Sequence, residues 1–202
     1  MSSVAPPGVF VHERGLCESV DVGAGTRVWA FAHVLPGAQV GRDCNVGDGA
    51  FIEGGARLGD RVTVKNAVLV WAGVDVGDDV FLGPAMVFTN DLWPRAHDRK
   101  SPDRLLGTRV GTGATIGANA TIICGATIGD HAFVGAGAVV AADVAAHALV
   151  VGNPARRVGW VCRCAGRLDD DLACGCGSRY RLVSQGRGLE LADPDDQIGV
   201  SG

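Results

Sequence analysis

The chain is poor in aromatic residues and has no long apolar run. Phe, Trp and Tyr make up 5% of its 202 residues, whereas Gly occurs 31 times. Ordinary α/β enzymes rarely have this composition, which favours a repeat with a densely packed backbone. No apolar stretch approaches the roughly 20 residues of a membrane-spanning helix, and the opening residues MSSVAPPGVF lack the pattern of a signal peptide. We therefore expect a soluble, cytoplasmic protein without a membrane partner.

An excess of basic residues is also missing. Lys and Arg number 18 against 22 Asp and Glu, a net charge of −4, and the basic residues form no stripe. Nucleic acid and anionic membranes are therefore not expected as partners. In a cytoplasmic chain, seven cysteines are more consistent with free thiols or metal ligands than with disulfides.

What the chain does contain is a repeat of six residues. An apolar residue occupies every sixth position from Val22 to Phe88 and again from Val110 to Val140, eighteen positions in all. Gly directly follows ten of them, and the residue two positions earlier is small or aliphatic. A period of six matches neither a helix nor a lone strand.

Six residues make one short strand and one tight turn, so three units close a triangular coil of 18 residues. Coils of this kind stack about 4.8 Å apart, and each strand pairs with the strands above and below it. The repeat therefore predicts an all-β solenoid of about seven coils. Open ends of solenoids need caps, for which residues 1–15 and the segment after Val150 are the candidates.

The repeat is interrupted once, by FTNDLWPRAHDRKSPDRLLG, from Phe88 to Gly107. A loop of this length that leaves a rigid wall is usually functional, so we expect residues 89–109 to be extruded. Asn90 and Asp91 stand where the chain leaves the wall. Phe88, Trp93 and Pro94 are expected to anchor the loop by packing.

Several phrases in order, among them DRVTVKNAVLVW, DVFLGPAMVFTNDLWPRA, GATIGANATIICGATIG and VVGNPARRVGW, resemble the nucleotide-sugar N-acetyltransferases of the hexapeptide-repeat acyltransferase family. The resemblance covers about residues 11–160. It implies a left-handed parallel β-helix domain over residues 1–160, a homotrimer, and acetyl-CoA in clefts between neighbouring prisms. It also implies acetylation of the amino group of a UDP- or dTDP-linked amino sugar.

The resemblance implies roles for residues near the interruption. Asn90 would position the acceptor amine, Asp91 would hydrogen-bond the amine or hold its ammonium form, and His33 would face the cleft. Lys65 and Asn66 match a stretch that lines the substrate pocket. That stretch ends in W-D/E-G in the family but in WAG here, with Ala72 in place of the acid. Further candidates are Arg95, for a substrate phosphate or a surface ion pair, and the outward-facing Trp29 and Trp71, for a subunit interface or base stacking.

The second block of repeats is the candidate cofactor wall. Its small residues would let a pantetheine arm lie flat against the backbone, and two arginines in NPARR would meet the CoA phosphates or cap the last coil. The candidates are Gly117, Asn119, Gly135, Ala136, Arg156 and Arg157.

Acid–base chemistry favours an amine over an alcohol as acceptor. A sugar amine has a pKa of roughly 8, so a useful fraction is neutral near neutral pH, whereas an alcohol needs a firm base worth about 10² to 10⁴ in rate. An N-acetyltransferase can therefore work by alignment and oxyanion stabilisation. The alternatives are an O-acetyltransferase with His33 or His97 as base, a zinc carbonic anhydrase of the same fold, and a non-catalytic scaffold.

The C-terminal part is distinct. Cys162, Cys164, Cys174 and Cys176 lie within 15 residues of each other, and four thiols in a cytoplasmic chain favour a tetrahedral, structural zinc site. We expect a zinc-ribbon-like tail over residues 161–192, although the C-x-C spacing leaves an appendage with free thiols as the alternative. Residues 193–202 are expected to be disordered.

Overall fold

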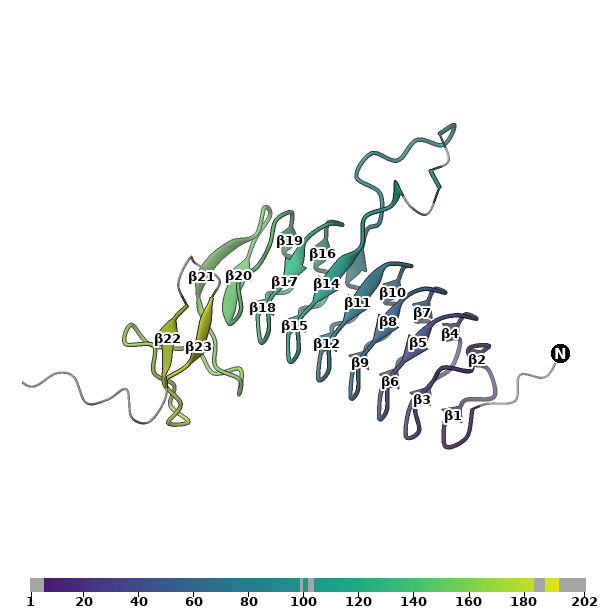
Figure 1. Cartoon of the computed structure of the whole chain (residues 1–202), viewed down its shortest axis with the longest axis horizontal. Helices are drawn as coiled ribbons and strands as arrows, with labels where there is room; N and C mark the ends of the chain where they lie inside the picture. Colours follow the sequence, from purple (N-terminus) through teal and green to yellow (C-terminus); the bar gives the residue numbers. More distant parts are fainter. Residues whose placement is uncertain (1–5, 99, 102–103, 184–187, 193–202) are drawn as a thin grey trace, which may run out of the picture.

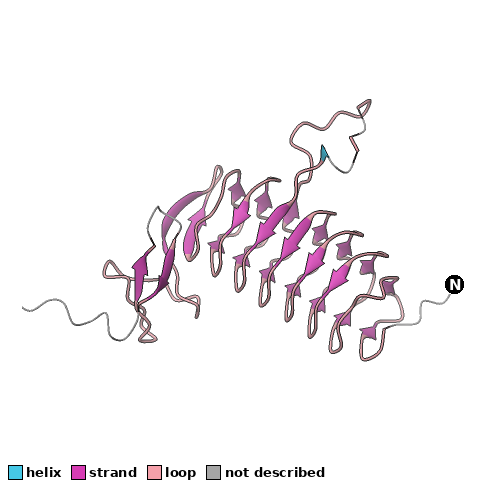
Figure 2. Ribbon diagram, viewed as in Figure 1, coloured by secondary structure: helices cyan, strands magenta, loops and turns pink. Residues whose placement is uncertain are grey.

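The computed structural model describes residues 6–98, 100–101, 104–183 and 188–192. The chain winds into a left-handed parallel β-helix of about eight turns, with the N-terminus at one end and a small separate lobe at the other (Figure 1). Strands make up the regular structure almost completely (Figure 2). No helix among the described residues is long and apolar enough to cross a bilayer.

Three sheets form the walls of the solenoid. The first sheet consists, in spatial order, of β1 (Phe10–Val11), β3 (Arg27–Val28), β6 (Asn45–Val46), β9 (Thr63–Val64), β12 (Phe81–Leu82), β15 (Thr115–Ile116), β18 (Phe133–Val134), β20 (Ala148–Val151) and β21 (Arg156–Trp160). The second consists of β2 (Leu16–Cys17), β4 (His33–Val34), β7 (Phe51–Ile52), β10 (Leu69–Val70), β13 (Val87–Phe88), β16 (Thr121–Ile122) and β19 (Val139–Val140). The third consists of β5 (Gln39–Val40), β8 (Arg57–Leu58), β11 (Val74–Val76), β14 (Thr108–Val110) and β17 (Thr127–Ile128).

The six-residue repeat sets both the register and the core. Partners in neighbouring parallel strands are 18 residues apart away from the interruption, as in the pairing of Val46 with Val64. All eighteen repeat positions are buried inside the prism, because the second residue of each short strand points inward. The predicted fold is therefore confirmed, and its core is a stack of Val, Ile and Leu layers with Phe88 among them.

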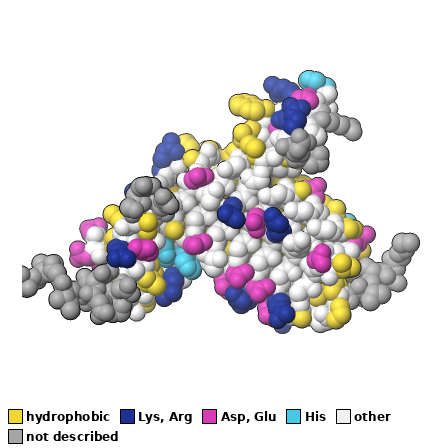
Figure 3. Space-filling model, in the orientation of Figure 1, with side chains coloured by type: hydrophobic (Ala, Val, Ile, Leu, Met, Phe, Trp, Pro, Cys, Tyr) yellow, Lys and Arg dark blue, Asp and Glu magenta, His cyan; other side chains and the backbone are white. Residues whose placement is uncertain are grey.

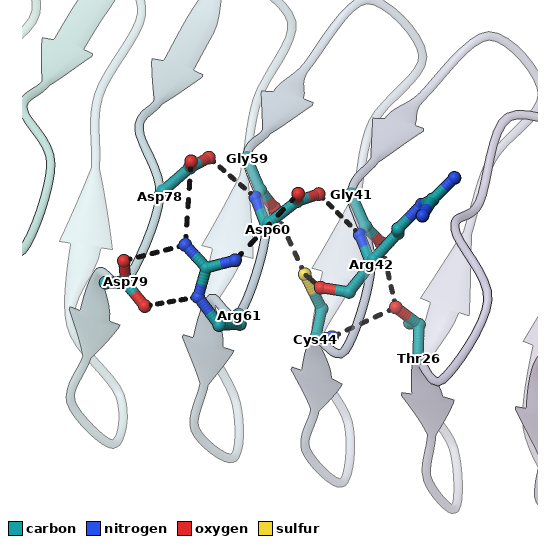
Figure 4. A network of polar contacts seen from close by, with 9 residues as sticks. All are labelled: Thr26, Gly41, Arg42, Cys44, Gly59, Asp60, Arg61, Asp78 and Asp79. Atoms are coloured by element: carbon teal, nitrogen blue, oxygen red, sulfur yellow. Dashed lines mark hydrogen bonds and ion pairs between the residues drawn. The ribbon is translucent and has the colours of Figure 1, made fainter.

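The three edges of the prism receive names used below. The asparagine edge joins the first sheet to the second through residues 29–32, 47–50, 65–68, 83–86, 117–120 and 135–138. The loop edge joins the second to the third through residues 35–38, 53–56, 71–73, 89–107, 123–126 and 141–143. The aspartate edge joins the third to the first through residues 23–26, 41–44, 59–62, 77–80, 111–114, 129–132 and 145–147, and its polar contacts are shown in Figure 4.

Both ends of the solenoid depart from the sequence expectation. The helix makes about eight turns instead of seven, because β1 already pairs in parallel with β3 and so belongs to the first coil and not to a separate cap. The apolar spacing is irregular there, with five residues between Cys17 and Val22, and four between Val140 and Val144 near the other end. A strict period of six therefore misses these coils.

The C-terminal end is closed by a hairpin, as the search for caps after Val150 suggested. Strand β21 runs antiparallel to β20, with Ala148 opposite Trp160 and Val151 opposite Arg156. Beyond it lies the C-terminal lobe, which contains the antiparallel pair β22 (Tyr180–Leu182) and β23 (Leu189–Leu191). The predicted disorder of residues 193–202 lies outside the described residues.

Candidate functional site

The interruption leaves the solenoid at the loop edge and projects away from it (Figure 1). Its extent is 89–107, two residues shorter than predicted, because Thr108 and Arg109 pair with β11 in strand β14. The two stems are joined by a hydrogen bond from the Leu106 N–H to the Asn90 carbonyl (3.0 Å). The loop therefore returns close to the point at which it left.

The base of the loop is rigid. The Thr89 N–H donates to the Ile122 carbonyl (3.1 Å), and the Thr89 hydroxyl accepts from the Cys124 N–H (2.9 Å). The Trp71 indole N–H donates to the Phe88 carbonyl (2.8 Å) from the coil before. Asn90 is half-buried on this base, and among the described residues nothing hydrogen-bonds its carboxamide. Its amide and carbonyl are therefore available to a ligand.

A carboxylate missed by the sequence reading lies beside Trp71. Glu53, one coil earlier on the loop edge, accepts a hydrogen bond from the Ala72 N–H (2.8 Å). An acid is thus present next to Ala72, the position where the family motif carries its own Asp or Glu. The 18-residue coil could have revealed it, since Glu53 stands directly below Trp71 in the repeat.

Asp91 is part of an ion pair inside the loop. Its Oδ1 accepts from Lys100 Nζ and from the Trp93 N–H (2.8 Å), and Lys100 also donates to the Trp93 carbonyl (3.1 Å). The hydrogen bond from Lys100 is the main cause that lowers the pKa of Asp91. Both contacts use Oδ1, so Oδ2 has no hydrogen-bond partner among the described residues and faces no competitor for an ammonium group.

The outer part of the loop does not pack as expected. Phe88 is fully buried in the core, but Trp93 is 78% exposed and Pro94 is also exposed. Leu92 and Leu106 add further apolar surface, visible on the projecting loop in Figure 3. Anchoring of the loop by Trp93 and Pro94 is therefore wrong for the isolated chain, in which the Asp91–Lys100 pair holds the loop together.

The two candidate histidines lie apart from Asn90 within one chain. His33 Nε2 is 2.7 Å from Glu18 Oε2, and its ring meets Phe51 edge-on at 5.8 Å. Its strand β4 is three strands away from β13 in the second sheet, a separation of about 14 Å at the usual strand spacing. His97 is exposed on the loop.

Most substrate and cofactor candidates lie on the asparagine edge, across the second sheet from the loop. There Lys65 is half-buried, whereas Asn66, Asn119 and Ala136 are exposed. A Cβ at Gly117 would come within 2.5 Å of the Ala136 nitrogen. These glycines are thus already required by coil stacking, which leaves a smooth wall as a by-product.

The two arginines of NPARR lie on β21 at the C-terminal end. Arg156 and Arg157 line a pocket of about 400 Å³ together with Pro154 and residues 140–145. The Arg157 guanidinium stacks on the Trp160 ring at 4.1 Å. The pocket borders the loop edge, so a cation is available there for a phosphate. Arg95 is exposed on the loop and forms an isolated bridge with Asp98.

The tryptophans expected at an interface are both half-buried and serve different edges. Trp71 supports the loop base, whereas Trp29 on the asparagine edge donates to Asn45 Oδ1 (2.8 Å) and stacks near Phe10 at 5.5 Å. One chain therefore divides the predicted site residues between the two edges that border the second sheet. A single prism does not bring them together.

The four tail cysteines do come together. Their sulfur atoms all lie within 4.8 Å of one another, with 3.6 Å between Cys162 and Cys176 and between Cys164 and Cys174. A tetrahedral ion with bonds of about 2.3 Å to sulfur has S···S edges of about 3.8 Å, whereas a disulfide needs about 2.05 Å. The thiols therefore fit a tetrahedral metal ion.

Comparison with known proteins agrees with this geometry. The chain matches the family described as bacterial transferase hexapeptide (six repeats) over residues 19–54 and 107–142, and the hexapeptide repeat of succinyl-transferase over residues 37–72. It is 46% identical over 183 residues to the dTDP-3-amino-3,6-dideoxy-alpha-D-galactopyranose 3-N-acetyltransferase of Aneurinibacillus thermoaerophilus, covering 87% of this chain and 94% of the relative.

Solved structures show the same fold. A hexapeptide transferase family protein from Anaplasma phagocytophilum has a TM-score of 0.51 at 13% identity, covering 77% of each chain. PerB from Caulobacter crescentus, solved with CoA and GDP-perosamine, has a TM-score of 0.47 at 25% identity over 76% of this chain, which spans 55% of the length of PerB. The chain belongs to the hexapeptide-repeat acyltransferase family and is similar within it to the nucleotide-sugar N-acetyltransferases.

Proposed function

We propose that this protein transfers an acetyl group from acetyl-CoA to the amino group of a dTDP-linked amino sugar. The observation that carries the proposal is the 46% identity to the dTDP-amino-sugar N-acetyltransferase over 87% of the chain. Such an extent includes the loop edge as well as the repeats. The free carboxamide of Asn90 on a rigid base supports the same function.

The chemistry asks the protein to align its substrates. The amine nitrogen attacks the acetyl carbonyl carbon, the carbon–sulfur bond breaks, and CoA leaves as a thiolate while the new amide loses a proton to solvent. The amine has a pKa of roughly 8 and the thiol of about 8.5, so neither end needs strong acid or base. Asn90 would hold the amine by its carboxamide, and Asp91 Oδ2 would accept from it.

The O-acetyltransferase alternative rests on His33 or His97. His33 is held by Glu18, an arrangement that could support a general base. However, it lies on a different strand of the second sheet from the loop base, so it would have to act from a neighbouring subunit. The division of the candidate residues between two edges gives no reason to prefer this alternative.

A trimer would bring the two edges together. The outward residues of the second sheet are mostly apolar, namely Leu16, His33, Phe51, Leu69, Val87, Thr121 and Val139. Those of the third sheet are polar or charged, namely Gln39, Arg57, Asp75, Arg109 and Thr127. An exposed apolar face of this kind favours association, so we infer a cytoplasmic homotrimer in which the loop edge of one chain meets the asparagine edge of the next.

A panel of nucleotide amino sugars tests the function. Purified protein is incubated with acetyl-CoA and dTDP- or UDP-linked sugars that carry the amine at C3 or C4, and products are read by mass spectrometry. We expect a mass increase of about 42 Da, one acetyl group, on the dTDP-linked 3-amino-3,6-dideoxyhexose first. Acetylation of an alcohol on amine-free sugars, or no transfer to any member, would contradict the proposal. Light scattering that returns a 20.7 kDa particle would contradict the trimer.

The tail supports a separate proposal, that the four cysteines hold one structural zinc ion. Four thiolates fill a tetrahedral site and leave no open position for chemistry. The cluster is also remote from the loop, so acetyl transfer should survive chelation at moderate temperature. Elemental analysis should give about one zinc per chain. Protein with no metal and four rapidly titratable thiols would contradict the site.

A further inference from the structure

The C-terminal lobe contains two copies of one small turn. Residues 161–167 read VCRCAGR and residues 173–179 read ACGCGSR, which are offset by twelve positions. In each copy the first cysteine N–H donates to the carbonyl four residues on, at 2.8 and 2.9 Å, and accepts from the N–H three residues on, at 2.9 and 2.8 Å. A bridge closes each turn, Val161 with Arg167 and Ala173 with Arg179.

The duplication places the thiols in crossed pairs. The first cysteine of one turn faces the second of the other, so that Cys162 approaches Cys176 and Cys164 approaches Cys174. Gly166 makes this possible, because a Cβ there would come within 3.0 Å of the Cys174 sulfur. The lobe is therefore built around the thiol cluster.

Apart from the thiols, the lobe has little to hold it together. Its own buried cluster consists of Cys162, Leu168, Tyr180 and Leu189. Ordering the backbone costs about 1–2 kcal/mol per residue, and so small an apolar core does not offset that cost over the whole lobe. A metal ion would supply the missing stabilisation.

The lobe is in direct contact with the last coil of the solenoid. The buried His147 bonds through Nδ1 to the Val161 carbonyl (2.9 Å) and accepts at its own carbonyl from the Val161 N–H (2.8 Å). On the same edge Gly188 lies so close to Ala146 that a Cβ would come within 2.6 Å of the Ala146 nitrogen. Histidine side chains lie at this junction in Figure 3.

Tyr180 joins the thiol cluster to the solenoid. Its hydroxyl donates to the Cys162 sulfur (3.1 Å) and accepts from the Arg163 N–H (3.0 Å). Its ring lies 4.7 Å from the His147 ring, behind which His131 follows at 5.0 Å. Whatever fixes the thiols therefore also fixes the ring that covers the end of the prism.

We propose that the metal-bound lobe is the C-terminal end cap of the solenoid, and that Tyr180 couples metal binding to the closure of the last coil. The inference rests on the proposed zinc site and is independent of the acetyltransferase function. Zinc would order the two turns, and the turns would hold Tyr180 against His147 and keep β21 on β20. Without zinc the last coil would open while the central coils stay folded.

Hydrogen exchange of the full-length chain tests the coupling. After treatment with a strong zinc chelator, amides of residues 144–161 should exchange about tenfold faster or more, whereas those of residues 45–82 should be unchanged. Cys164→Ser should show the same local change without chelator. Cys124→Ala is the matched control, because this buried thiol lies outside the cluster, and it should behave like the unaltered protein.

A second variant separates the metal from the cap. Tyr180→Leu should keep about one zinc per chain and yet exchange at residues 144–161 as fast as the chelated protein. Zinc that binds without protecting residues 144–161, or protection that survives in Tyr180→Leu, would overturn the cap and leave the metal site standing. Absence of zinc overturns both, and loss of protection throughout the solenoid overturns local closure. None of these measurements uses acetyl transfer.

Discussion

The loop edge and the aspartate edge are built from the same backbone turn but carry different residues after the inward side chain. On the aspartate edge that residue is Gly in six turns, from Gly23 to Gly129. A Cβ at Gly59 would come within 2.8 Å of the Asp78 nitrogen in the next coil. On the loop edge the same position carries Leu35, Glu53, Trp71, Thr89, Ile123 and Ala141.

The aspartate edge uses its side chains to bind coil to coil. Asp60 accepts from the Arg42 N–H and Asp78 from the Asp60 N–H, both at 2.8 Å, and Arg61 pairs with Asp79 (2.6 Å) (Figure 4). On the loop edge, side chains instead support the residues that leave the wall. The comparison teaches that one repeat can serve stacking on one edge and ligand binding on another.

The largest expected effect comes from removing the ligand-facing amide of the loop edge. Asn90→Ala should lower kcat/KM by about 10²-fold or more, or about 2.7 kcal/mol, because the amine loses its alignment. Steady-state kinetics on the dTDP-amino sugar measures this. His33→Asn and His97→Asn should each cost about tenfold or less. A dead histidine variant beside a nearly normal Asn90→Ala would transfer the chemistry to a base.

The aspartate edge should respond in stability instead of activity. Gly59→Ala forces a Cβ against Asp78 in the next coil and should destabilise the fold by about 1–3 kcal/mol, the usual cost of overpacking. The melting temperature should fall while kcat at low temperature stays close to normal. Gly175→Ala is the control, since nothing lies within 4 Å of a Cβ there. An unchanged melting temperature in Gly59→Ala would show that the coils can separate at no cost.

Inside the loop, Lys100→Met should have an intermediate effect on activity. The variant keeps most of the side-chain volume but removes the partner of Asp91, so the loop loses its internal tie and kcat/KM should fall about tenfold, or about 1.4 kcal/mol. The melting temperature should not change, because the loop adds nothing to the core. Arg104→Met is matched to it, since Arg104 forms only an exposed pair with Asp98 at 3.7 Å, and should cost less than twofold. Equal effects of the two variants would argue against the tie.

The smallest effect is expected from the acid dependence of the aspartate edge. The hydrogen bond from Arg61 is the main cause that lowers the pKa of Asp79. A lowered carboxyl pKa contributes stability that is present above the unfolded value of about 3.9 and lost as pH falls through the folded value. Asp79→Asn should therefore cost less than about 1 kcal/mol at pH 7, and the difference should vanish near pH 3.

Melting temperatures at pH 7, 5 and 3 measure this difference. Asp170→Asn, which alters an exposed aspartate of the tail, should follow the unaltered protein at each pH. A difference between Asp79→Asn and the unaltered protein that grows toward pH 3 would show that the ionised carboxylate is not the stabilising form.

The fold was predictable from sequence because every coil repeats the same packing problem. A buried apolar residue and a tight turn recur every six positions, so eighteen residues independently report one architecture. The terminal coils were missed since they face only one neighbour, and spacings such as that from Val140 to Val144 are tolerated there. The gathering of the four tail thiols was also foreseen, because thiols in two close pairs have few other reasons to recur.

The interior of the loop was not predictable. The pairing of Asp91 with Lys100 spans nine residues without any periodicity, and neither propensity nor pattern indicates which cation an isolated carboxylate will choose. The exposure of Trp93 was missed for the same reason. Glu53, by contrast, could have been found by writing the sequence in rows of eighteen, because coil stacking converts that spacing into contact.

The excursion at residues 89–107 also leaves the pairing on both sides of it undisturbed. Val87 pairs with Thr121 and Val74 with Thr108, so strands before and after the insertion meet in the register that an unbroken repeat would give. The loop is in this sense a graft whose length and composition are free of the scaffold. Lineages can therefore exchange or remodel it, and with it the sugar they accept, without rebuilding the prism that carries it.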